Sequence, residues 1–137
     1  MGQAELSAAD RALIEAARDA RENAYAPISR YKVGVALRDA EGAVHRGANV
    51  ENIVLSLTSC AEATAVHRAV ADGKRAFDAI AVVTADSPPA SPCGSCRQLL
   101  AHWGVERVLL ANPAGEVVRT SLTALLPRAF ALPDPPE

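Results

Sequence analysis

Aromatic residues and cysteines are scarce in this 137-residue sequence, which has 4% aromatic residues and three cysteines. With so few aromatic side chains, Ala, Val and Leu must fill the core, and the 50% hydrophobic content allows this. An odd number of cysteines argues against a disulfide framework and for a reducing compartment. Residues 1–10 lack the basic and apolar regions of a signal peptide, so we expect a cytoplasmic protein.

An excess of charge of one sign and long apolar runs are also missing. The net charge is −2 and no run of five or more basic residues occurs, which argues against a nucleic-acid partner. No apolar stretch approaches the roughly 20 residues of a membrane-spanning helix, so we expect no membrane association. The length is that of one ordinary domain. We therefore predict a single domain over residues 1–137, with the Pro-rich residues 132–137 as a disordered tail.

Hydrophobic periodicity predicts helices that alternate with strands. Leu13, Ile14 and Ala17 recur at helical spacing, whereas the apolar run 80–83 is typical of a strand covered by helices on both faces. Helices are predicted for residues 8–23, 60–72, 94–103 and 121–126, and strands for residues 31–38, 44–48, 77–84, 107–111 and 116–119. The order predicts an α/β protein of three layers, α/β/α, with a mixed sheet of about five strands.

The three cysteines form two clusters, and this pattern is the most informative feature of the chain. Glu62 follows Cys60 by two positions, and Cys93 and Cys96 form a Cys-x-x-Cys pair downstream. Three thiols and one acid describe a zinc site with an open position, because structural zinc sites usually have four protein ligands. An open zinc position lowers the pKa of water to about 7. The arrangement matches the signature of zinc-dependent deaminases, in which His or Cys and then Glu precede Pro-Cys-x-x-Cys.

Both cysteine clusters lie at predicted helix N-termini, where the helix dipole favours the thiolate. Three thiolates on one Zn²⁺ leave a formal charge of −1, and we expect Arg97 and the dipoles to offset it. His67 cannot share this metal, because seven helical residues separate it from Cys60 by about 10 Å. His45 and His102 have no ligand spacing to the cysteines and are interpreted as surface residues.

Other interpretations of the cysteines exist. Cys93 and Cys96 could form a redox pair, since Cys-x-x-Cys at a helix start lowers a thiol pKa, but this leaves Cys60 and Glu62 unexplained. A purely structural zinc, or buried reduced cysteines, would have no use for Glu62. The combination of both clusters therefore favours an enzyme over a redox protein or a zinc-stabilised module.

The sequence resembles the small, homotetrameric class of cytidine deaminases from about residue 25 to residue 130. The matching stretches are Tyr25-Ala26-Pro27, Val33-Gly34, Asn49-Val50-Glu51-Asn52, Cys60-Ala61-Glu62, the run from Ser91 to Gln98 and the run from Leu125 to Phe130. The resemblance implies the cytidine deaminase fold, with one Zn²⁺ per subunit held by the three cysteines. It implies that Glu62 transfers protons while cytidine or 2′-deoxycytidine is hydrolysed to its uracil nucleoside and ammonia, in pyrimidine salvage.

The same resemblance implies the substrate contacts. Asn49 and Glu51 would bind the ribose 3′-hydroxyl, and the backbone N–H of Ala61 would bind the base carbonyl. Tyr31, where relatives usually have Phe, would line the pocket. Phe130 would stack on the base in a neighbouring subunit's site, so we expect a homotetramer with shared active sites. From spacing alone, Tyr31 and Phe130 are better explained as ordinary core aromatics.

The chain departs from the family pattern at three places. Ala63 stands where many relatives have Arg, which would leave the charge to Arg97 and the dipoles. The other two departures place aliphatic residues where relatives have polar aromatics, at Ile28 and in residues 53–55 with the sequence Ile-Val-Leu. Both lie near the expected subunit junction and indicate a relaxed or altered base preference. A deaminase of a cytosine-containing antibiotic such as blasticidin S is the alternative enzyme. Residues 49–52 argue against it, because they suit a plain ribose.

Overall fold

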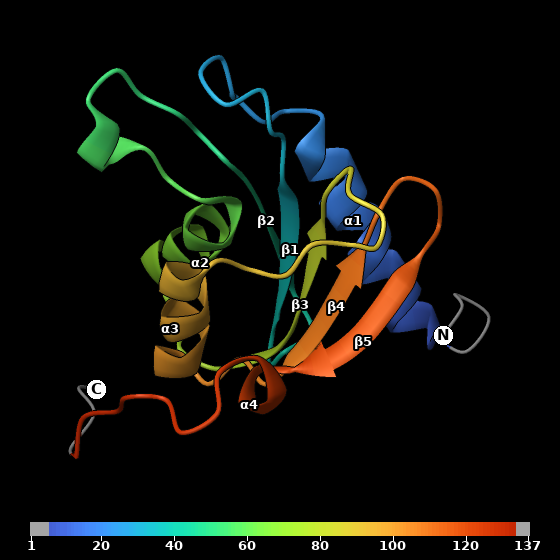
Figure 1. The fold of residues 1–137 in the computed structure, drawn as a ribbon. Helices are drawn as coiled ribbons and strands as arrows, with labels where there is room; N and C mark the ends of the chain where they lie inside the picture. Colours follow the sequence, from blue (N-terminus) through green and yellow to red (C-terminus); the bar gives the residue numbers. More distant parts are fainter. Residues whose placement is uncertain (1–5, 134–137) are drawn as a thin grey trace.

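A mixed sheet of five strands forms the centre of the computed structural model, which describes residues 6–133 (Figure 1). The strand order is β2-β1-β3-β4-β5. The strands are β1 (Gly34–Asp39), β2 (Val44–Ala48), β3 (Phe77–Val83), β4 (Arg107–Ala111) and β5 (Val117–Ser121). β3 and β4 are parallel and the other neighbours are antiparallel, which confirms the predicted mixed sheet. Residues 134–137 of the predicted disordered tail lie outside the described residues.

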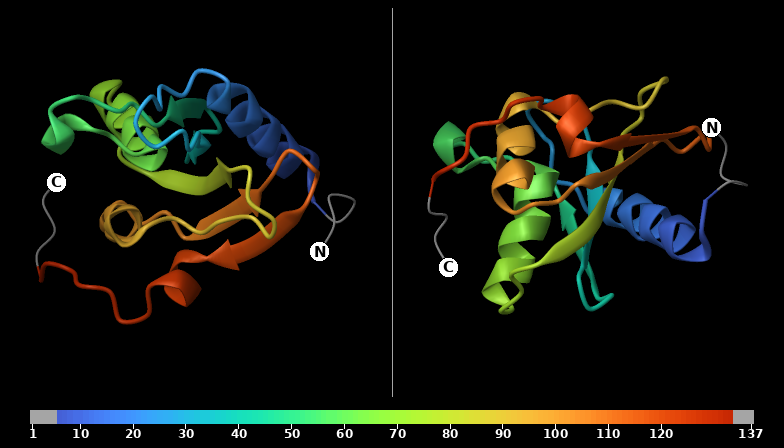
Figure 2. Two further views of the ribbon diagram at one scale, coloured as in Figure 1. Left: turned by 45° about the horizontal axis from the view of Figure 1, so that its top comes forward. Right: turned by 90° about the horizontal axis from the view of Figure 1, so that it is seen from below.

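Helices cover both faces of this sheet. α1 (Ala8–Arg21) packs on one face, and α2 (Ala61–Ala71) and α3 (Gly94–His102) pack on the other, so the predicted three layers are confirmed (Figures 1 and 2). The short α4 (Leu122–Leu125) follows β5 directly. A 3₁₀ helix at Leu55–Leu57 was not predicted. None of the helices in residues 6–133 is long and apolar enough to cross a membrane.

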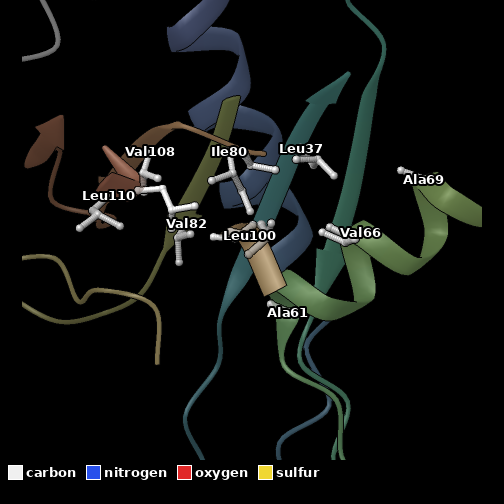
Figure 3. Packing of buried hydrophobic residues seen from close by; sticks show 13 residues of the cluster. Leu37, Ala61, Val66, Ala69, Ile80, Val82, Leu100, Val108 and Leu110 are labelled. Carbon is white, nitrogen blue, oxygen red and sulfur yellow. The ribbon is translucent and has the colours of Figure 1, made fainter. Parts of the chain in front are cut away.

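The core lies on both sides of β3, the central strand. Ile80 and Val82 face α2 and α3, where they pack in one cluster with Val66 and Leu100 (Figure 3). The intervening residues of β3 face α1 and join a second cluster with Leu13. Because successive side chains of a strand point to opposite faces, a stretch of strand that is buried on both faces must be apolar at every position. The prediction from the apolar run 80–83 is therefore confirmed.

The sheet brings the starts of α2 and α3 to the same edge. Val83, the last residue of β3, pairs with Gly34 on one side and with Ala111 on the other. Residues 49–60 lead from this edge to α2, and residues 84–93 lead from it to α3 (upper part of Figure 1, green and yellow). Ligand sites of α/β sheets form at the carboxyl ends of parallel strands. The edge where β3 and β4 end is therefore the expected place for a site.

Two strand boundaries differ from the prediction by two residues or more, and three others differ by one residue. The strand expected from residue 31 begins only at Gly34, because the side chain of Asn49 binds the backbone of the preceding residues. Its Nδ2 donates to the carbonyl of Tyr31 at 2.7 Å, and its Oδ1 accepts from the N–H of Val33 at 2.9 Å. β5 continues to Ser121, two residues beyond the prediction, since its ladder with β4 extends to that residue.

His45 is not a surface residue, contrary to the sequence interpretation. Its side chain is only 10% exposed and lies 2.8 Å from Oδ2 of Asp39. The hydrogen bond to His45 lowers the pKa of Asp39 to about 2. This pair stabilises the β1–β2 hairpin at the end of β1 opposite to Gly34, so His45 takes no part in the cysteine cluster.

Gly47 sets the distance between α2 and the sheet. A Cβ at this position would lie 2.5 Å from the carbonyl oxygen of Ala61 and 2.8 Å from Cβ of Ala65. Both residues belong to α2, and Ala61 is its first residue. The backbone of β2 therefore approaches the helix so closely that any side chain would push α2 away.

We predict that Gly47→Ala lowers the free energy of unfolding by about 1–3 kcal/mol, because overpacking forces the backbone to shift. Urea unfolding followed by circular dichroism at constant zinc concentration measures this. Gly94→Ala is the matched control, since a Cβ built there has nothing within 4 Å other than its chain neighbours and the backbone of its own helix. Equal stability of the two variants would contradict the close approach.

Candidate metal centre and substrate pocket

The three cysteines converge although they come from two different helices. Cys60 is the N-cap residue of α2, and Cys93 is the N-cap residue of α3. Cys96 lies in the first turn of α3 and is buried. The three Sγ atoms all lie within 4.8 Å of one another. Both clusters are therefore at helix N-termini, as predicted, and the positive ends of two helix dipoles point toward the sulfurs.

The donor set fits a zinc ion. Burial raises the pKa of the Cys60 thiol, and burial together with the charge of Glu62 raises the pKa of Cys96. Burial also opposes ionisation of Cys93, but its hydrogen bonds with Cys96 and Cys60 lower its pKa. Three thiolates beside a carboxylate thus need a compensating cation, and a coordinated thiol loses its proton outright. Thiolates select zinc among the common divalent metals, and three protein ligands are typical of catalytic zinc.

Glu62 is the second residue of α2 and stands beside the thiols. It is 5% exposed and lines a cavity that Cys60 and Cys93 also line. Burial raises the pKa of Glu62, so the protonated carboxyl becomes accessible closer to neutral pH. A buried carboxyl with a raised pKa in a cavity is a candidate general acid and base.

A cavity of about 310 Å³ opens beside Glu62. Its size is at the lower end of the range for small-molecule sites. No lysine or arginine belongs to its lining within the described part of the chain. The lining residues are Ser29, Tyr31, Val33, Asn49, Glu51, Thr58, Ser59, Cys60, Ala61, Glu62, Val82, Thr84, Ala90, Ser91 and Cys93.

Asn49 and Glu51 both line this cavity, and both also hold the 27–33 segment that forms one wall. Oε1 of Glu51 accepts hydrogen bonds from the N–H groups of Ile28 at 2.8 Å and Ser29 at 3.1 Å. The hydroxyl of Ser29 donates to the other carboxylate oxygen, and this bond lowers the pKa of Glu51. A carboxylate offers about four acceptor positions, so one remains for a ligand.

Tyr31 and Ala61 line the cavity as well. The hydroxyl of Tyr31 donates to the carboxylate of Asp86 in the β3–α3 connection. Ala61 is the first residue of α2, so its N–H is one of the groups that a helix leaves without an internal partner. The N–H of Ala61 is therefore available to a ligand.

Phe130 and Arg97 do not line the cavity of their own chain. Phe130 is 71% exposed, and its carbonyl accepts a hydrogen bond from the side chain of Gln98 on α3 at 3.0 Å. Arg97 follows Cys96, but its guanidinium donates to the carbonyls of Pro92 at 2.8 Å and Leu125 at 2.7 Å. Arg97 therefore fixes the residues around the start of α3.

Sequence reasoning missed Ser29, Thr84 and Asp86. Thr84 could have been found, because it follows a buried strand that ends at the site edge. Ser29 and Asp86 carried no local signal. Asp86 meets Tyr31 only through the fold, since 55 positions separate them in the sequence.

Comparisons with known proteins agree with this geometry. Residues 7–112, which include all three cysteines and Glu62, match the family model of the cytidine and deoxycytidylate deaminase zinc-binding region. The chain is 45% identical over 124 residues to the cytidine deaminase of Sporosarcina psychrophila, and the match covers 89% of this chain and 91% of the relative. It is 30% identical over 133 residues to the blasticidin-S deaminase of Bacillus cereus, covering 91% and 94%.

Two solved structures of cytidine deaminases are also similar to this chain. The crystal structure of cytidine deaminase from Burkholderia pseudomallei has a TM-score of 0.85 and 48% sequence identity, and the match covers 91% of this chain and all of that one. The cytidine deaminase structure from Mycobacterium tuberculosis has a TM-score of 0.75 and 37% identity, covering 89% and 97%.

We predict that Cys93→Ser loses the bound zinc, because two thiols and a hydroxyl are a poor substitute for three thiolates. Elemental analysis after dialysis against a weak chelator measures the zinc bound per chain. Glu62→Gln is the control: it should keep its zinc, since the carboxyl lies beside the sulfurs but outside their group. Zinc retained by Cys93→Ser at the wild-type level would contradict the assignment.

Proposed function

The chain belongs to the cytidine and deoxycytidylate deaminase family, and from this premise we propose that it hydrolyses cytidine and 2′-deoxycytidine to uridine and 2′-deoxyuridine. Water replaces the exocyclic amino group, which leaves as ammonia. One observation carries the proposal: the three thiols and the buried Glu62 meet beside a single cavity of nucleoside size. A redox pair or a structural zinc site would require no such carboxyl.

Glu62 carries out the proton transfers. When bound by the three cysteines, zinc acts as a Lewis acid that lowers the pKa of water to about 7. The carboxylate of Glu62 accepts one proton from the attacking water and delivers it to ring N3. It then takes the second proton from the new hydroxyl on C4 and delivers it to the amine, which leaves as ammonia when the C4–N bond breaks. The burial of Glu62 raises its pKa and thereby makes both protonation states accessible.

The cavity walls orient the nucleoside. Asn49 and Glu51 bind the ribose 3′-hydroxyl, and the N–H of Ala61 binds the base carbonyl. Glu51 keeps one acceptor position after its bonds to the 27–33 segment, which suits a hydroxyl donor. A site that hydrogen-bonds a substrate hydroxyl discriminates strongly against analogues without it.

The substrate is the free nucleoside and not its 5′-phosphate. The residues described as lining the cavity include two carboxylates, Glu51 and Glu62, and neither lysine nor arginine. A phosphate group would meet negative charge there without a cation to bind it. Blasticidin S stays the alternative substrate, but the more similar relatives are named cytidine deaminases.

We also propose that Arg97 balances the charge of the thiolates in place of an arginine at position 63. Its guanidinium is held by two backbone carbonyls and has no carboxylate partner among the described residues. Its charge therefore remains available to the adjacent sulfur cluster. The three free thiols favour a reducing compartment, so we propose that the protein acts in the cytoplasm. We also propose that the reaction belongs to pyrimidine salvage.

We expect Glu62→Gln to lower kcat for cytidine by at least about 10²–10⁴-fold, the usual contribution of general acid–base catalysis. The loss of absorbance as cytidine becomes uridine gives the rate. Zinc content and unfolding should match the wild type, which serves as the control for folding.

The same assay tests the substrate class. Cytidine 5′-monophosphate, 2′-deoxycytidine 5′-monophosphate and blasticidin S are compared with the two nucleosides. Zinc-loaded wild type that leaves both nucleosides unchanged would refute the activity. Faster turnover of either phosphate or of blasticidin S would refute the nucleoside assignment.

We propose that the chain forms a homotetramer in which neighbours share active sites. Phe130 does not line the cavity of its own chain and is 71% exposed. A second exposed apolar group, Ile53, Leu55 and Leu57, lies on the connection before α2, and Ile53 is 93% exposed. Large apolar side chains that are exposed together are a mark of protein interfaces. A neighbouring subunit that covers these residues would place Phe130 over another chain's site.

Shared sites predict complementation between two inactive variants. Glu62→Gln lacks the proton carrier and Phe130→Ala lacks the stacking ring, so each alone should have low activity. Mixed tetramers contain sites with Glu62 from one chain and Phe130 from the other. Co-refolding the two variants should therefore restore activity, measured with cytidine. Activity equal to the average of the separate variants would contradict shared sites.

A further inference from the structure

Two walls of the cavity are joined by the side chains of Tyr31 and Asp86. Tyr31 belongs to the 27–33 segment, and Asp86 belongs to the 84–93 connection between β3 and α3. The Tyr31 hydroxyl donates to Oδ2 of Asp86. Burial, followed by this hydrogen bond, raises the pKa of Tyr31, so the hydroxyl keeps the proton that it donates. Asp86 itself does not line the cavity.

The Asp86 side of this contact is rigidly anchored. Asn112, which is 1% exposed, donates from Nδ2 to the carbonyl of Asp86 at 2.9 Å and to Oε1 of Glu116 at 3.0 Å. Its Oδ1 accepts from the N–H of Glu116 at 3.0 Å. The hydroxyl of Ser87 donates to the same carboxylate of Glu116. The β4–β5 turn therefore fixes the backbone that carries Asp86.

The Tyr31 side is not fixed by regular structure. The 27–33 segment belongs to neither a helix nor a strand, and Arg30 within it has a φ of 61°. A positive φ is unfavourable for a residue with a Cβ. Asn49 and Glu51 hold this segment from one side, and Asp86 holds it from the other.

We propose that the hydrogen bond between Tyr31 and Asp86 acts as a latch, which fixes the sugar-binding side of the cavity before the ligand binds. The hydrogen bond ties the 27–33 segment to the anchored 84–93 connection. Because the carbonyl of Tyr31 accepts from Asn49, and Ser29 binds Glu51, the latch also fixes those two side chains. Asp86 is thus a positioning residue for the nucleoside. The identity of this ligand rests on the proposed function.

Kinetics test the latch. Tyr31→Phe and Asp86→Ala should each raise KM for cytidine about three- to tenfold, the value of one ordinary hydrogen bond. kcat should change less than about twofold, because Cys60 and Glu62 are held by α2. The double variant should match either single variant, since both remove the same bond. Asp86→Asn keeps an acceptor oxygen and should restore most of the lost affinity.

Limited proteolysis tests the same latch without catalysis. Trypsin cleaves after Arg30 and Lys32, both within the 27–33 segment. Asp86→Ala leaves these cleavage sites unchanged, yet it should speed cleavage there several-fold, because local opening exposes the backbone. Mass spectrometry identifies the cut. Tyr25→Phe is the matched control: it removes the chain's other tyrosine hydroxyl, which has no hydrogen bond in the described structure.

The outcomes separate the latch from the proposed function. An unchanged KM, a loss confined to kcat, additive effects in the double variant, or unchanged cleavage in Asp86→Ala would each overturn the latch. If zinc-loaded wild type does not deaminate cytidine but Asp86→Ala is cleaved faster than wild type, the latch stands and the proposed function falls.

Discussion

Three thiolates and a carboxylate can share a small volume only where positive potential offsets the repulsion between their negative charges. The fold provides this by beginning two helices at one edge of the sheet, with Cys60 and Cys93 as their N-cap residues. Parallel β3 and β4 end at the same edge, so the cavity opens where the backbone dipoles converge. The remaining architecture, including the close contact of α2 with Gly47, keeps these helix starts in place.

The walls of the cavity depend on side chains with two roles. Asn49 and Glu51 are proposed to bind the sugar, and both already bind the backbone of the 27–33 segment. Their own hydrogen bonds thus build the wall from which they act. This arrangement reduces the number of side-chain rotations that ligand binding must freeze.

Much of the fold followed from local patterns. The helical spacing of Leu13, Ile14 and Ala17 and the apolar run of β3 predicted α1 and the central strand. The cysteine clusters predicted thiols at helix starts. The start of β1 was misplaced because it depends on Asn49, a residue that follows β2. The Tyr31–Asp86 contact had no local signal, because the tertiary fold alone brings these residues together.

The connection between β3 and α3 is tethered at both ends. Asn112 holds the carbonyl of Asp86, and Arg97 holds the carbonyl of Pro92. Residues 87–91 therefore connect two backbone positions that side chains hold in place. Two residues of this segment, Ala90 and Ser91, line the cavity. Changes of sequence in this segment can reshape the cavity without displacing Cys93. A protein built in this way can diversify its ligand range through one short loop while its metal chemistry stays constant.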